Sequence, residues 1–406
     1  MKGFLSVGLA FVLVVVFLVT ACAAPATPTP TAAPKAPAPV ATSPAAAPKA
    51  PAAPPAAAAT KAPVAATPAP ATPAAKAPAA APVTMPRGLV MMAGSSPGSA
   101  GDLEGKWWQQ QIAKVYPNLA VRLIPGGFND GAHAVEVGDA DIGLIGSDTA
   151  QAAWEASIAF FKTPHKRIRA LYARSSPGTG IEAVVLDSSP IKQIADLKTR
   201  RIGIGQRDQT STFMWEKALK EVYGFDFSDV RANRGLVYYG NFDQVSAMVG
   251  ENKADVSLKM GPPDQPQWVA IDKAQPLRWL SYEDKFLKYW IDNFSGYAPS
   301  SIFLDAYSLY KSKPAAEQTN KTVAPAVLMI VRDDMQDAVA YEILKAVMAD
   351  DKGDSFMKQF RQAWMKVQPP FHMADNSTQA RTIPFHPGAT KYWAEKGYKV
   401  AEPAFK

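Results

Sequence analysis

Hydrophobic and polar positions divide the chain into three parts. Residues 4–19 form an apolar run, and residues 23–86 consist almost entirely of alanine, proline, threonine and lysine. From residue 87 onward, short apolar runs alternate with longer stretches whose apolar positions recur every three or four residues. The short runs are typical of buried strands, and the second pattern is typical of amphipathic helices. The globular part of the chain is therefore predicted to begin near residue 87.

The alternation predicts an α/β fold with mainly parallel sheets covered by helices on both faces. We expect Asp102 to cap one helix, and Ser147 with Asp148 to cap another. Residues 282–321 are rich in aromatic side chains but show no clear period. The expected strands are 89–92, 120–124, 142–145, 169–173, 181–186, 201–204, 235–239, 256–260, 277–280 and 327–331. The expected helices are 102–115, 131–137, 149–156, 194–198, 212–222, 242–251, 267–274, 336–348, 355–365 and 391–396.

The N-terminus has the layout of a secretory signal peptide. Lys2 precedes the apolar run, and small residues stand just before Cys22. Residues 19–22 read Val-Thr-Ala-Cys and resemble the bacterial lipobox, in which the cysteine is acylated. We therefore expect a lipoprotein signal peptide at 1–22, lipidation at Cys22, and an extracytoplasmic chain anchored to the cell membrane. The alternative is an uncleaved transmembrane anchor, because the run is near the short end of what spans about 30 Å of hydrocarbon.

Residues 23–86 are predicted to be a disordered linker. They contain no acidic and no aromatic residue, so they have too little apolar surface to offset the entropy of ordering. Proline-rich chain favours extended conformations of roughly 3.1 Å per residue. We expect a membrane tether that ends where the globular part begins.

Charge and chemistry exclude several classes of function. Five of the seven net positive charges are lysines within residues 1–86, which leaves +2 on the remaining 320 residues. That near-neutral balance gives no electrostatic footprint for nucleic acid. Cys22 is the single cysteine, so it forms no intramolecular disulfide and the globular part has no thiol nucleophile.

Motifs for catalysis are also missing. His133, His165, His372 and His386 show no metal-ligand spacing, and His386 in its Pro/Gly turn is expected to be structural. No nucleophile elbow or phosphate-binding loop occurs, and residues 203–205 lack the third glycine of a nucleotide fingerprint. We expect a protein that is not an enzyme and that uses no metal and no cofactor.

Polar and glycine-rich loops follow the expected strands. In open α/β sheets, ligands bind outside the carboxyl ends of the strands. Glycines allow close approach to the backbone, and helix N-termini favour anions. Two such units predict two lobes with a ligand cleft between them, although any one of these loops is also explained as an ordinary tight turn. The loops are residues 94–98, 125–127, 146–148, 206–211 and 261–264.

Five motifs in order give residues 88–400 a resemblance to the TAXI-type solute receptors of TRAP transporters. The most specific is the run Gly-Asp-Ala-Asp-Ile-Gly-Leu-Ile-Gly-Ser-Asp at 138–148. The others lie at 191–205, at 253–255 with 261–263, at 322–341, and at 386–392. The resemblance implies a type II periplasmic-binding-protein fold, with two lobes and a cleft. It also implies capture of a small organic anion for TRAP membrane subunits that are driven by an ion gradient.

Three loops depart from the family pattern. Residues 97–102 read Pro-Gly-Ser-Ala-Gly-Asp where the family usually has Gly-Gly-Thr-Tyr-Tyr-Pro. Residues 126–128 read Gly-Gly-Phe where the family has Gly-Gly-Ser with an asparagine three residues on, and residues 208–211 keep only the last hydroxyl of Gly-Ser-Gly-Thr. Tyr307 does match a family tyrosine. Because these loops contact the solute in the family, we expect a carboxylate or amino-acid-like solute that is not plain glutamate; Phe128 and residues 282–310 suggest one that is larger or more apolar.

The expected solute contacts come from the loops at the strand ends and from the matching tyrosine. The domain prediction assigns 87–175 and 322–406 to lobe 1 and 176–321 to lobe 2, in a monomer. The alternatives are the receptor of an ATP-driven importer, which shares the fold, a ligand-sensing module for a signalling partner, and an exported hydrolase. The expected solute-binding residues are Ser95, Ser96, Gly98, Ser99, Gly127, Phe128, Ser147, Asp148, Gln209, Thr210, Ser211, Met260, Asp264 and Tyr307.

Overall fold

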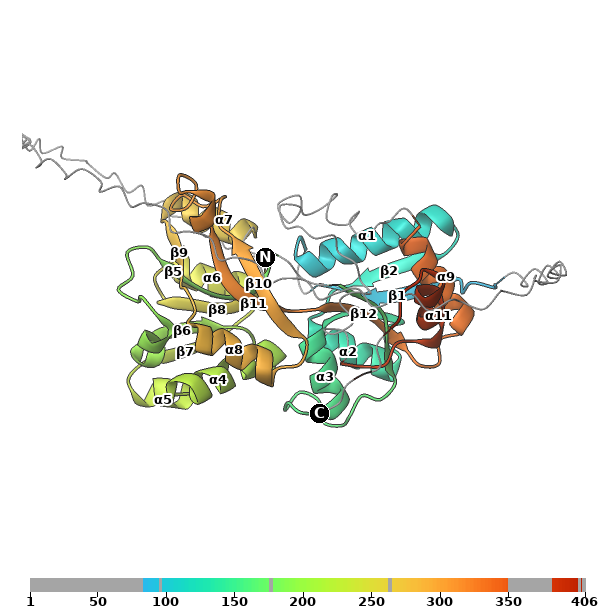
Figure 1. Ribbon diagram of the computed structural model, residues 1–406, viewed down its shortest axis with the longest axis horizontal. Coiled ribbons are helices and arrows are strands. Elements are labelled where there is room, and N and C mark those ends of the chain that lie inside the picture. The colour runs from blue at the N-terminus through green and yellow to red at the C-terminus, as the bar shows by residue number, and fades with distance from the viewer. Residues whose placement is uncertain are drawn as a thin grey trace, which may run out of the picture. The chain divides into compact units, whose positions relative to one another are not determined.

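Two five-stranded sheets with the same pattern of parallel and antiparallel neighbours organise the chain (Figure 1). The computed structural model describes residues 83–94, 97–174, 178–261, 265–349, 382–400 and 403. The first sheet has the order β2-β1-β3-β12-β4 and the second has the order β7-β6-β8-β5-β9. In each sheet, three parallel strands are followed by one antiparallel strand, β12 or β5, and then by a last strand that is antiparallel to it.

The strands of the first sheet are β1 (Gly88–Met92), β2 (Ala120–Ile124), β3 (Ile142–Gly146), β4 (Ile168–Arg174) and β12 (Val327–Arg332). Those of the second sheet are β5 (Gly180–Leu186), β6 (Arg201–Ile204), β7 (Leu236–Tyr239), β8 (Val256–Gly261) and β9 (Leu277–Trp279). A separate antiparallel ribbon, orange in Figure 1, pairs β10 (Tyr297–Phe303) with β11 (Thr319–Pro325).

Helices cover both faces of the first sheet. Successive side chains along each strand point to opposite faces, so both faces are apolar. Met329 and Val331 of β12 pack with α1 (Ala100–Val115), α9 (Asp337–Val347) and α11 (Pro387–Glu395). Leu328 and Ile330 point to the other face, where they pack with α2 (Phe128–Val137) and α3 (Ser147–Glu155). A period of two along the strand therefore serves two separate cores. We call this sheet with its five helices the first lobe.

The second sheet is covered in the same way. One face packs against α4 (Thr210–Tyr223), α5 (Phe227–Ala232), α8 (Asp284–Asn293) and the 3₁₀ turn η1 (Ile194–Thr199), in a core rich in aromatic rings. The other face packs against α6 (Phe242–Gly250) and α7 (Pro266–Ala274). A further 3₁₀ turn, η2 (Ala315–Glu317), precedes β11. We call this sheet with its helices the second lobe.

The chain crosses between the two sheets at two places. The first crossing follows β4 and leads into β5, and the second is the single residue Ala326 between β11 and β12. The ribbon is tied to the second lobe near the first crossing: Thr322 Oγ1 donates to the Ile181 carbonyl (2.8 Å), and Ser300 Oγ donates to the Thr179 carbonyl (2.7 Å). Both crossings therefore lie beside the ribbon.

The predicted α/β class is confirmed, and several details of the prediction are corrected. α3 begins at Ser147 with Gly146 as its N-cap, so Ser147 and Asp148 are in its first turn rather than ahead of it. Ser99, not Asp102, caps α1. The α2 and α4 helices begin earlier than expected, at Phe128 and Thr210, and α11 begins at Pro387.

Other parts of the prediction were missed or lie outside the described residues. The stretch 282–321, for which no period was found, contains α8, β10, η2 and the start of β11. The short helix α5 was not expected. The expected helix 355–365 and the N-terminal segments 1–22 and 23–82 lie outside the described residues. The predicted lobe boundary at 175/176 also lies outside them and that at 321/322 falls inside β11, so the division by residue number stays a prediction.

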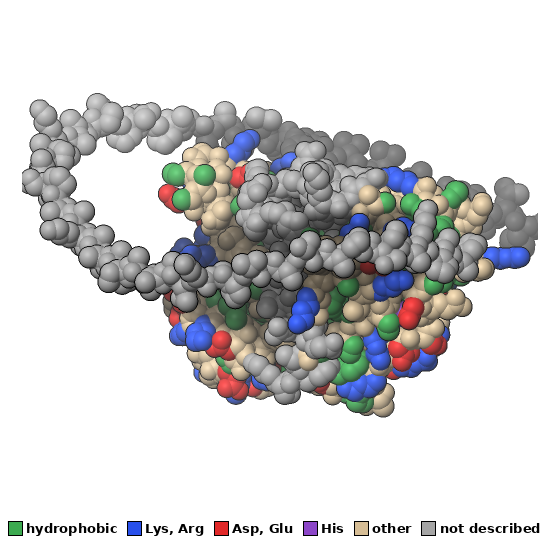
Figure 2. Space-filling view, turned by 45° about the vertical axis from the view of Figure 1, so that its right-hand side comes forward, with side chains coloured by type: hydrophobic (Ala, Val, Ile, Leu, Met, Phe, Trp, Pro, Cys, Tyr) green, Lys and Arg blue, Asp and Glu red, His purple; other side chains and the backbone are tan. Residues whose placement is uncertain are grey.

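Within the part of the chain that the structure describes, no helix combines the length and apolar character needed to cross a bilayer. On the face shown in Figure 2, the visible Lys and Arg side chains are interspersed with Asp and Glu side chains along the lower rim.

Contact between α9 and α11 supplies a test of the packing in the first lobe. A methyl group on Gly388 would lie 2.1 Å from the backbone oxygen of Asp337 and 3.1 Å from the Ala340 Cβ atom. Gly388→Ala is therefore expected to push the two helices apart and to destabilise the fold by about 1–3 kcal/mol. The measurement is the free energy of unfolding in urea. The control is Gly88→Ala, whose added methyl would meet its nearest atom at 3.4 Å; equal effects of the two substitutions would contradict the prediction.

Candidate functional site

The amino-terminal ends of three helices, α2, α3 and α4, meet where the two lobes touch. Asn129 of α2 bonds to the second lobe twice. Its Nδ2 donates to the backbone oxygen of Asp208 (2.7 Å), and its Oδ1 accepts from Thr210 Oγ1 (2.9 Å). The Thr210 hydroxyl also lies 3.5 Å from the Thr149 hydroxyl of α3. Asn129, Thr149 and Thr210 are all buried.

Tyr297, the first residue of β10, joins the same place from the ribbon. Its hydroxyl donates to Asp148 Oδ2 (3.0 Å) and lies 3.3 Å from the Met260 sulfur at the end of β8. Asp148 Oδ1 accepts from the Thr149 backbone N–H (2.7 Å). We call the group Asn129, Asp148, Thr149, Thr210, Met260 and Tyr297 the junction, since it contains residues of both lobes and of the ribbon.

The first turn of α3 is also bonded to the second crossing. The Ser147 N–H donates to the Ala326 carbonyl (2.8 Å), and Ser147 Oγ accepts from the Ala326 N–H (3.1 Å). The same hydroxyl lies 3.4 Å from the Gly296 carbonyl. Ser147 was expected to contact solute, but its side chain is used to hold the crossing.

At the junction the first turn of α4 has no side-chain cap, whereas Asp130 accepts from the Gly127 N–H at the start of α2 (2.9 Å) and Asp148 accepts from the Thr149 N–H in α3 (2.7 Å). Gly127, Gly146 and Gln209 are the N-caps of α2, α3 and α4, and none of them accepts a side-chain capping bond from its helix. Uncapped first-turn N–H groups, together with the helix dipole, favour an anion. The buried Thr212 hydroxyl in the first turn of α4 has no hydrogen-bond partner among the described residues. The arrangement therefore offers unused donors on the side of the second lobe.

Asp148 is the charged group of the junction. Only 1% of its surface is exposed, and burial raises the pKa of its carboxyl, although its hydrogen bonds from Thr149 and Tyr297 act in the opposite direction. Burial also raises the pKa of the Tyr297 phenol, and the nearby Asp148 carboxyl adds to that effect. A Cβ atom at Gly146 would lie 2.2 Å from Asp148 Oδ1 and 3.3 Å from the Phe128 ring, so only glycine leaves room for both side chains.

Apart from Ser147 and Tyr307, the predicted solute-binding residues divide into four groups. Phe128, Asp148, Thr210 and Met260 lie at or beside the junction. Gly98, Ser99 and Gly127 are used in helix capping: Gly98 N and Gly127 N donate to Asp102 and Asp130, and Ser99 Oγ accepts from Asp102 N. Gln209 lies against Gly205, and Ser211 is half-buried in the first turn of α4. Ser95, Ser96 and Asp264 lie outside the described residues.

Tyr307 is placed away from the junction contacts. It is fully buried in the second lobe, where its ring packs against Trp279 with 4.4 Å between centroids. The family match that suggested a solute contact thus falls on a core position.

Three residues of the junction were missed from the sequence. The comparison with the family asparagine, which falls on Gly131, overlooked Asn129 two residues earlier, whose amide bonds to the second lobe. Thr149 was placed in a helix without a role, and Tyr297 lies in the stretch whose period was unclear. A polar residue directly after the Gly126–Gly127 turn was the available signal for Asn129.

A buried ion pair lies in the first lobe beside the first crossing. Arg174, the last residue of β4, binds Glu104 of α1 through Nε and Nη2, and the Nε to Oε1 distance is 2.9 Å. Both side chains are almost fully buried. Such a pair is strongly coupled, because each charge depends on the other for its compensation.

Two of the histidines that are separated in the sequence lie close together in the structure. His133 Nδ1 and His165 Nε2 lie 3.1 Å apart, and burial lowers the pKa of His165. His386 caps α11 by accepting from the Gly388 N–H (3.2 Å), as expected of a structural residue. His372 lies outside the described residues, within which no cluster of three or more metal-ligating side chains occurs.

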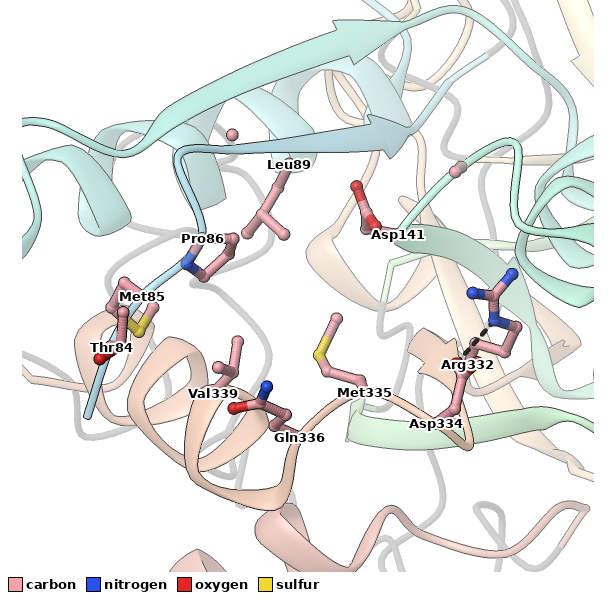
Figure 3. Close-up of a pocket in the computed structure, with 12 residues that line it drawn as sticks. Thr84, Met85, Pro86, Leu89, Asp141, Arg332, Asp334, Met335, Gln336 and Val339 are labelled. Carbon is pink, nitrogen blue, oxygen red and sulfur yellow. Dashed lines mark hydrogen bonds and ion pairs between the residues drawn. The ribbon is translucent and has the colours of Figure 1, made fainter.

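A cavity of about 500 Å³ lies at the opposite edge of the first sheet (Figure 3). Its walls include Leu89 at the start of β1, Asp141 just before β3, and Met335 and Val339 beside the start of α9. Arg332 and Asp334 form an ion pair at one side of it (2.7 Å). These are the amino ends of the parallel strands, whereas ligands of open α/β sheets bind at the carboxyl ends. The junction, not this cavity, is therefore the candidate site.

The shared pattern of strand directions, the two crossings and the facing helix N-termini define the class: this is the type II periplasmic-binding-protein fold, as the sequence resemblance implied. A family model for the NMT1-like family matches residues 117–397, more than half of the chain, so the protein belongs to the NMT1-like family. No curated protein sequence matches the chain.

Solved structures of binding proteins are similar to this chain at low identity. The periplasmic aliphatic sulphonate binding protein SsuA from Escherichia coli is 15% identical, with a TM-score of 0.42, over 79% of this chain and 95% of that chain. The alkanesulfonate-binding protein SsuA from Xanthomonas axonopodis pv. citri, bound to MOPS, is 13% identical, with a TM-score of 0.42, over 74% and 86%. An ancestral arginine-binding protein bound to arginine is 14% identical, with a TM-score of 0.38, over 69% and 99%.

Asn129 gives a test of the contact between the lobes. Asn129→Ala removes both of its bonds to the second lobe, so the first turn of α4 is expected to open more often and its backbone amides to exchange faster, by about tenfold for a loss of roughly 1.4 kcal/mol. The measurement is hydrogen exchange of peptides covering residues 206–213. The control is Asn293→Ala, which removes a bond to Tyr289 within the second lobe. Unchanged exchange at 206–213 in Asn129→Ala would rule out the contact.

The buried ion pair gives a second test. Arg174→Met leaves the Glu104 carboxylate buried without its partner and is expected to destabilise the fold by about 3–5 kcal/mol, while the double variant Glu104→Met/Arg174→Met regains most of the loss. The measurement is urea unfolding. Lys288→Met, which breaks an exposed pair with Asp292, is the control and is expected to cost less than about 1 kcal/mol. A double variant no more stable than Arg174→Met would show that the pair is not coupled in this way.

Proposed function

We propose that the protein is an extracytoplasmic solute-binding protein, not an enzyme, which holds a small organic anion between its lobes and delivers it to a membrane permease. The observation that carries the proposal is the meeting of the N-termini of α2 and α3 from the first lobe with the uncapped N-terminus of α4 from the second lobe at the junction. An anion at this place interacts favourably with the dipoles of both lobes at once, so its binding stabilises their contact. Membership of the NMT1-like family supports the same function.

The TAXI-type motifs favour a TRAP transporter as the partner, in which case the permease is driven by an ion gradient. The receptor of an ATP-driven importer is the alternative, because both kinds of receptor share this fold. The gene beside this one decides between them: a TRAP membrane subunit supports the first, and an ATP-binding subunit supports the second.

The N-terminal sequence supports a location outside the cytoplasmic membrane. A signal peptide that ends at Cys22, acylation of that cysteine and a flexible linker at 23–86 would keep the lobes near the permease. Tethering of the monomer would raise its effective concentration near the permease without any further protein–protein contact.

The function is tested by native mass spectrometry of the full chain purified from its own host under mild conditions. We expect a fraction of the protein to carry one small molecule of discrete mass, because closed lobes release a bound solute slowly. The same preparation is then screened by thermal denaturation against carboxylates, sulfonates and amino acids at 1 mM. Stabilisation of about 4 kcal/mol is expected for a solute whose Kd is near 1 μM. A chain without bound solute and without any thermal response would refute the proposal, and turnover of an ester or peptide panel would replace it with hydrolysis.

A further inference from the structure

Two histidine rings of the first lobe face each other outside the junction. His133 lies on α2, and His165 lies 32 positions further along the chain, in the segment between α3 and β4. The His133 Nδ1 and His165 Nε2 atoms are 3.1 Å apart. The His165 ring is buried and the His133 ring is exposed, so the pair lies at the surface with one ring in contact with solvent. The proposed function uses neither histidine.

The second contact of His165 fixes the position of its ring hydrogen. His165 Nδ1 lies 2.9 Å from the Thr163 carbonyl, which can only accept, so Nδ1 carries the hydrogen and donates it. Burial lowers the pKa of His165, although its bond to Thr163 and the charge of Glu136 act in the opposite direction. The neutral ring then presents the Nε2 lone pair to His133. Histidines that bind a metal through one nitrogen commonly donate the other N–H to a backbone carbonyl, so His165 has the tautomer and the backbone partner of a metal ligand.

The spacing of the two nitrogens suits a shared cation as well as a hydrogen bond. Two imidazole nitrogens bound at about 2.0–2.1 Å to one tetrahedral Zn²⁺ lie about 3.3 Å from each other. The pair at 3.1 Å would therefore have to open by only about 0.2 Å. The hydrogen on His133 Nδ1 would move to Nε2, which is possible without loss of a bond because that ring is exposed to solvent.

The groups around the pair hold it in place and favour a positive charge. Glu136 lies one helical turn after His133 on α2, and its negative charge acts on His165. The Glu136 carboxylate is fixed by the Arg167 backbone N–H, which donates to Oε2 (2.9 Å). The Phe161 ring packs edge to face against His165, with 4.9 Å between centroids. A carboxylate and a packed ring around the ligands strengthen the binding of a cation.

We propose that His133 Nδ1 and His165 Nε2 together bind one divalent first-row cation of the kind that prefers imidazole ligands, of which Zn²⁺ is the probe. Water completes the coordination, because the pair supplies two ligands of the four that Zn²⁺ takes. Such a site is open to solvent, so its cation exchanges with the surroundings. When bound, the cation joins α2 to the segment that leads into β4. The inference does not depend on the proposed function.

The test is a calorimetric titration of the full chain, without an affinity tag and after removal of metals by a chelator. Zn²⁺ is added at pH 7.5, and Mg²⁺, which prefers oxygen ligands, is the control cation. We expect one Zn²⁺ to bind per chain and no response to Mg²⁺. Both histidines must be unprotonated to bind a metal, so the affinity for Zn²⁺ is expected to fall by at least about tenfold between pH 7.5 and pH 5.5.

Variants of the histidines assign the bound cation to the pair. His133→Gln and His165→Gln are each expected to weaken Zn²⁺ binding by at least about tenfold, because each removes one of the two ligands. His372→Gln, which removes a histidine outside the pair, is expected to leave the affinity unchanged. Should His165→Gln fail to fold, His133→Gln decides alone, since its side chain is exposed.

The paramagnetic resonance spectrum of bound Cu²⁺ provides a second readout, because it counts the coordinating nitrogens. Two are expected in the unaltered chain and one in His133→Gln. Absence of Zn²⁺ binding, an affinity that His133→Gln leaves unchanged, or a Cu²⁺ spectrum without nitrogen coupling would each overturn the metal site and leave the pair as a hydrogen bond between two neutral rings. None of these results would affect the solute-binding function, which native mass spectrometry tests separately.

Discussion

The hydrogen bonds between the first turn of α3 and the ribbon are the constraint on which the rest of the structure depends. Ser147 holds Ala326 at the crossing, and its neighbour Asp148 holds Tyr297 at the start of β10. One turn of helix thereby connects the first lobe to the segment through which the chain returns from the second lobe. The same turn contributes Thr149 to the lobe contact, so the crossing and the candidate site are parts of one hydrogen-bonded unit.

The parts of the fold that could be predicted from the sequence are those with strong local patterns. Apolar strands such as 142–145 and 327–331 were located to within one residue, because a strand buried on both faces needs an unbroken apolar run. The ribbon was missed because β10 reads Tyr-Ala-Pro-Ser-Ser-Ile-Phe, in which neither a run nor an alternation is visible. Its pairing with β11 joins partners that lie between 16 residues (Phe303 with Thr319) and 28 residues (Tyr297 with Pro325) apart, which a local pattern does not contain.

The candidate site shows the same limit in a different form. Asp148 and Thr210, which the structure brings together at the junction, were named from the sequence because each follows a predicted strand and loop, where α/β proteins bind ligands; their contact with a solute stays a prediction. Asn129 and Tyr297 could not be assigned, because their roles come from the approach of two lobes and a ribbon that are far apart in sequence. Ser147 was named for the same reason, and the structure shows its hydroxyl bonded to the second crossing, since a hydroxyl at a strand end serves a crossing as readily as a solute. The position of a residue along the chain thus indicated which residues lie near the candidate site. It did not indicate which hydrogen bonds each side chain makes there.

The single-residue link at Ala326 determines how the two lobes can move. β11 ends at Pro325 and β12 begins at Val327, so strands of two different sheets are separated by one pair of backbone torsions plus those of their immediate neighbours. The ring of Pro325 fixes its own φ angle, which removes one of the few remaining rotations. On this side of the molecule, therefore, few backbone torsions separate the ribbon from the first sheet. Any change in the angle between the ribbon and the first lobe on this side must therefore be taken up by the torsions of residues 325–327.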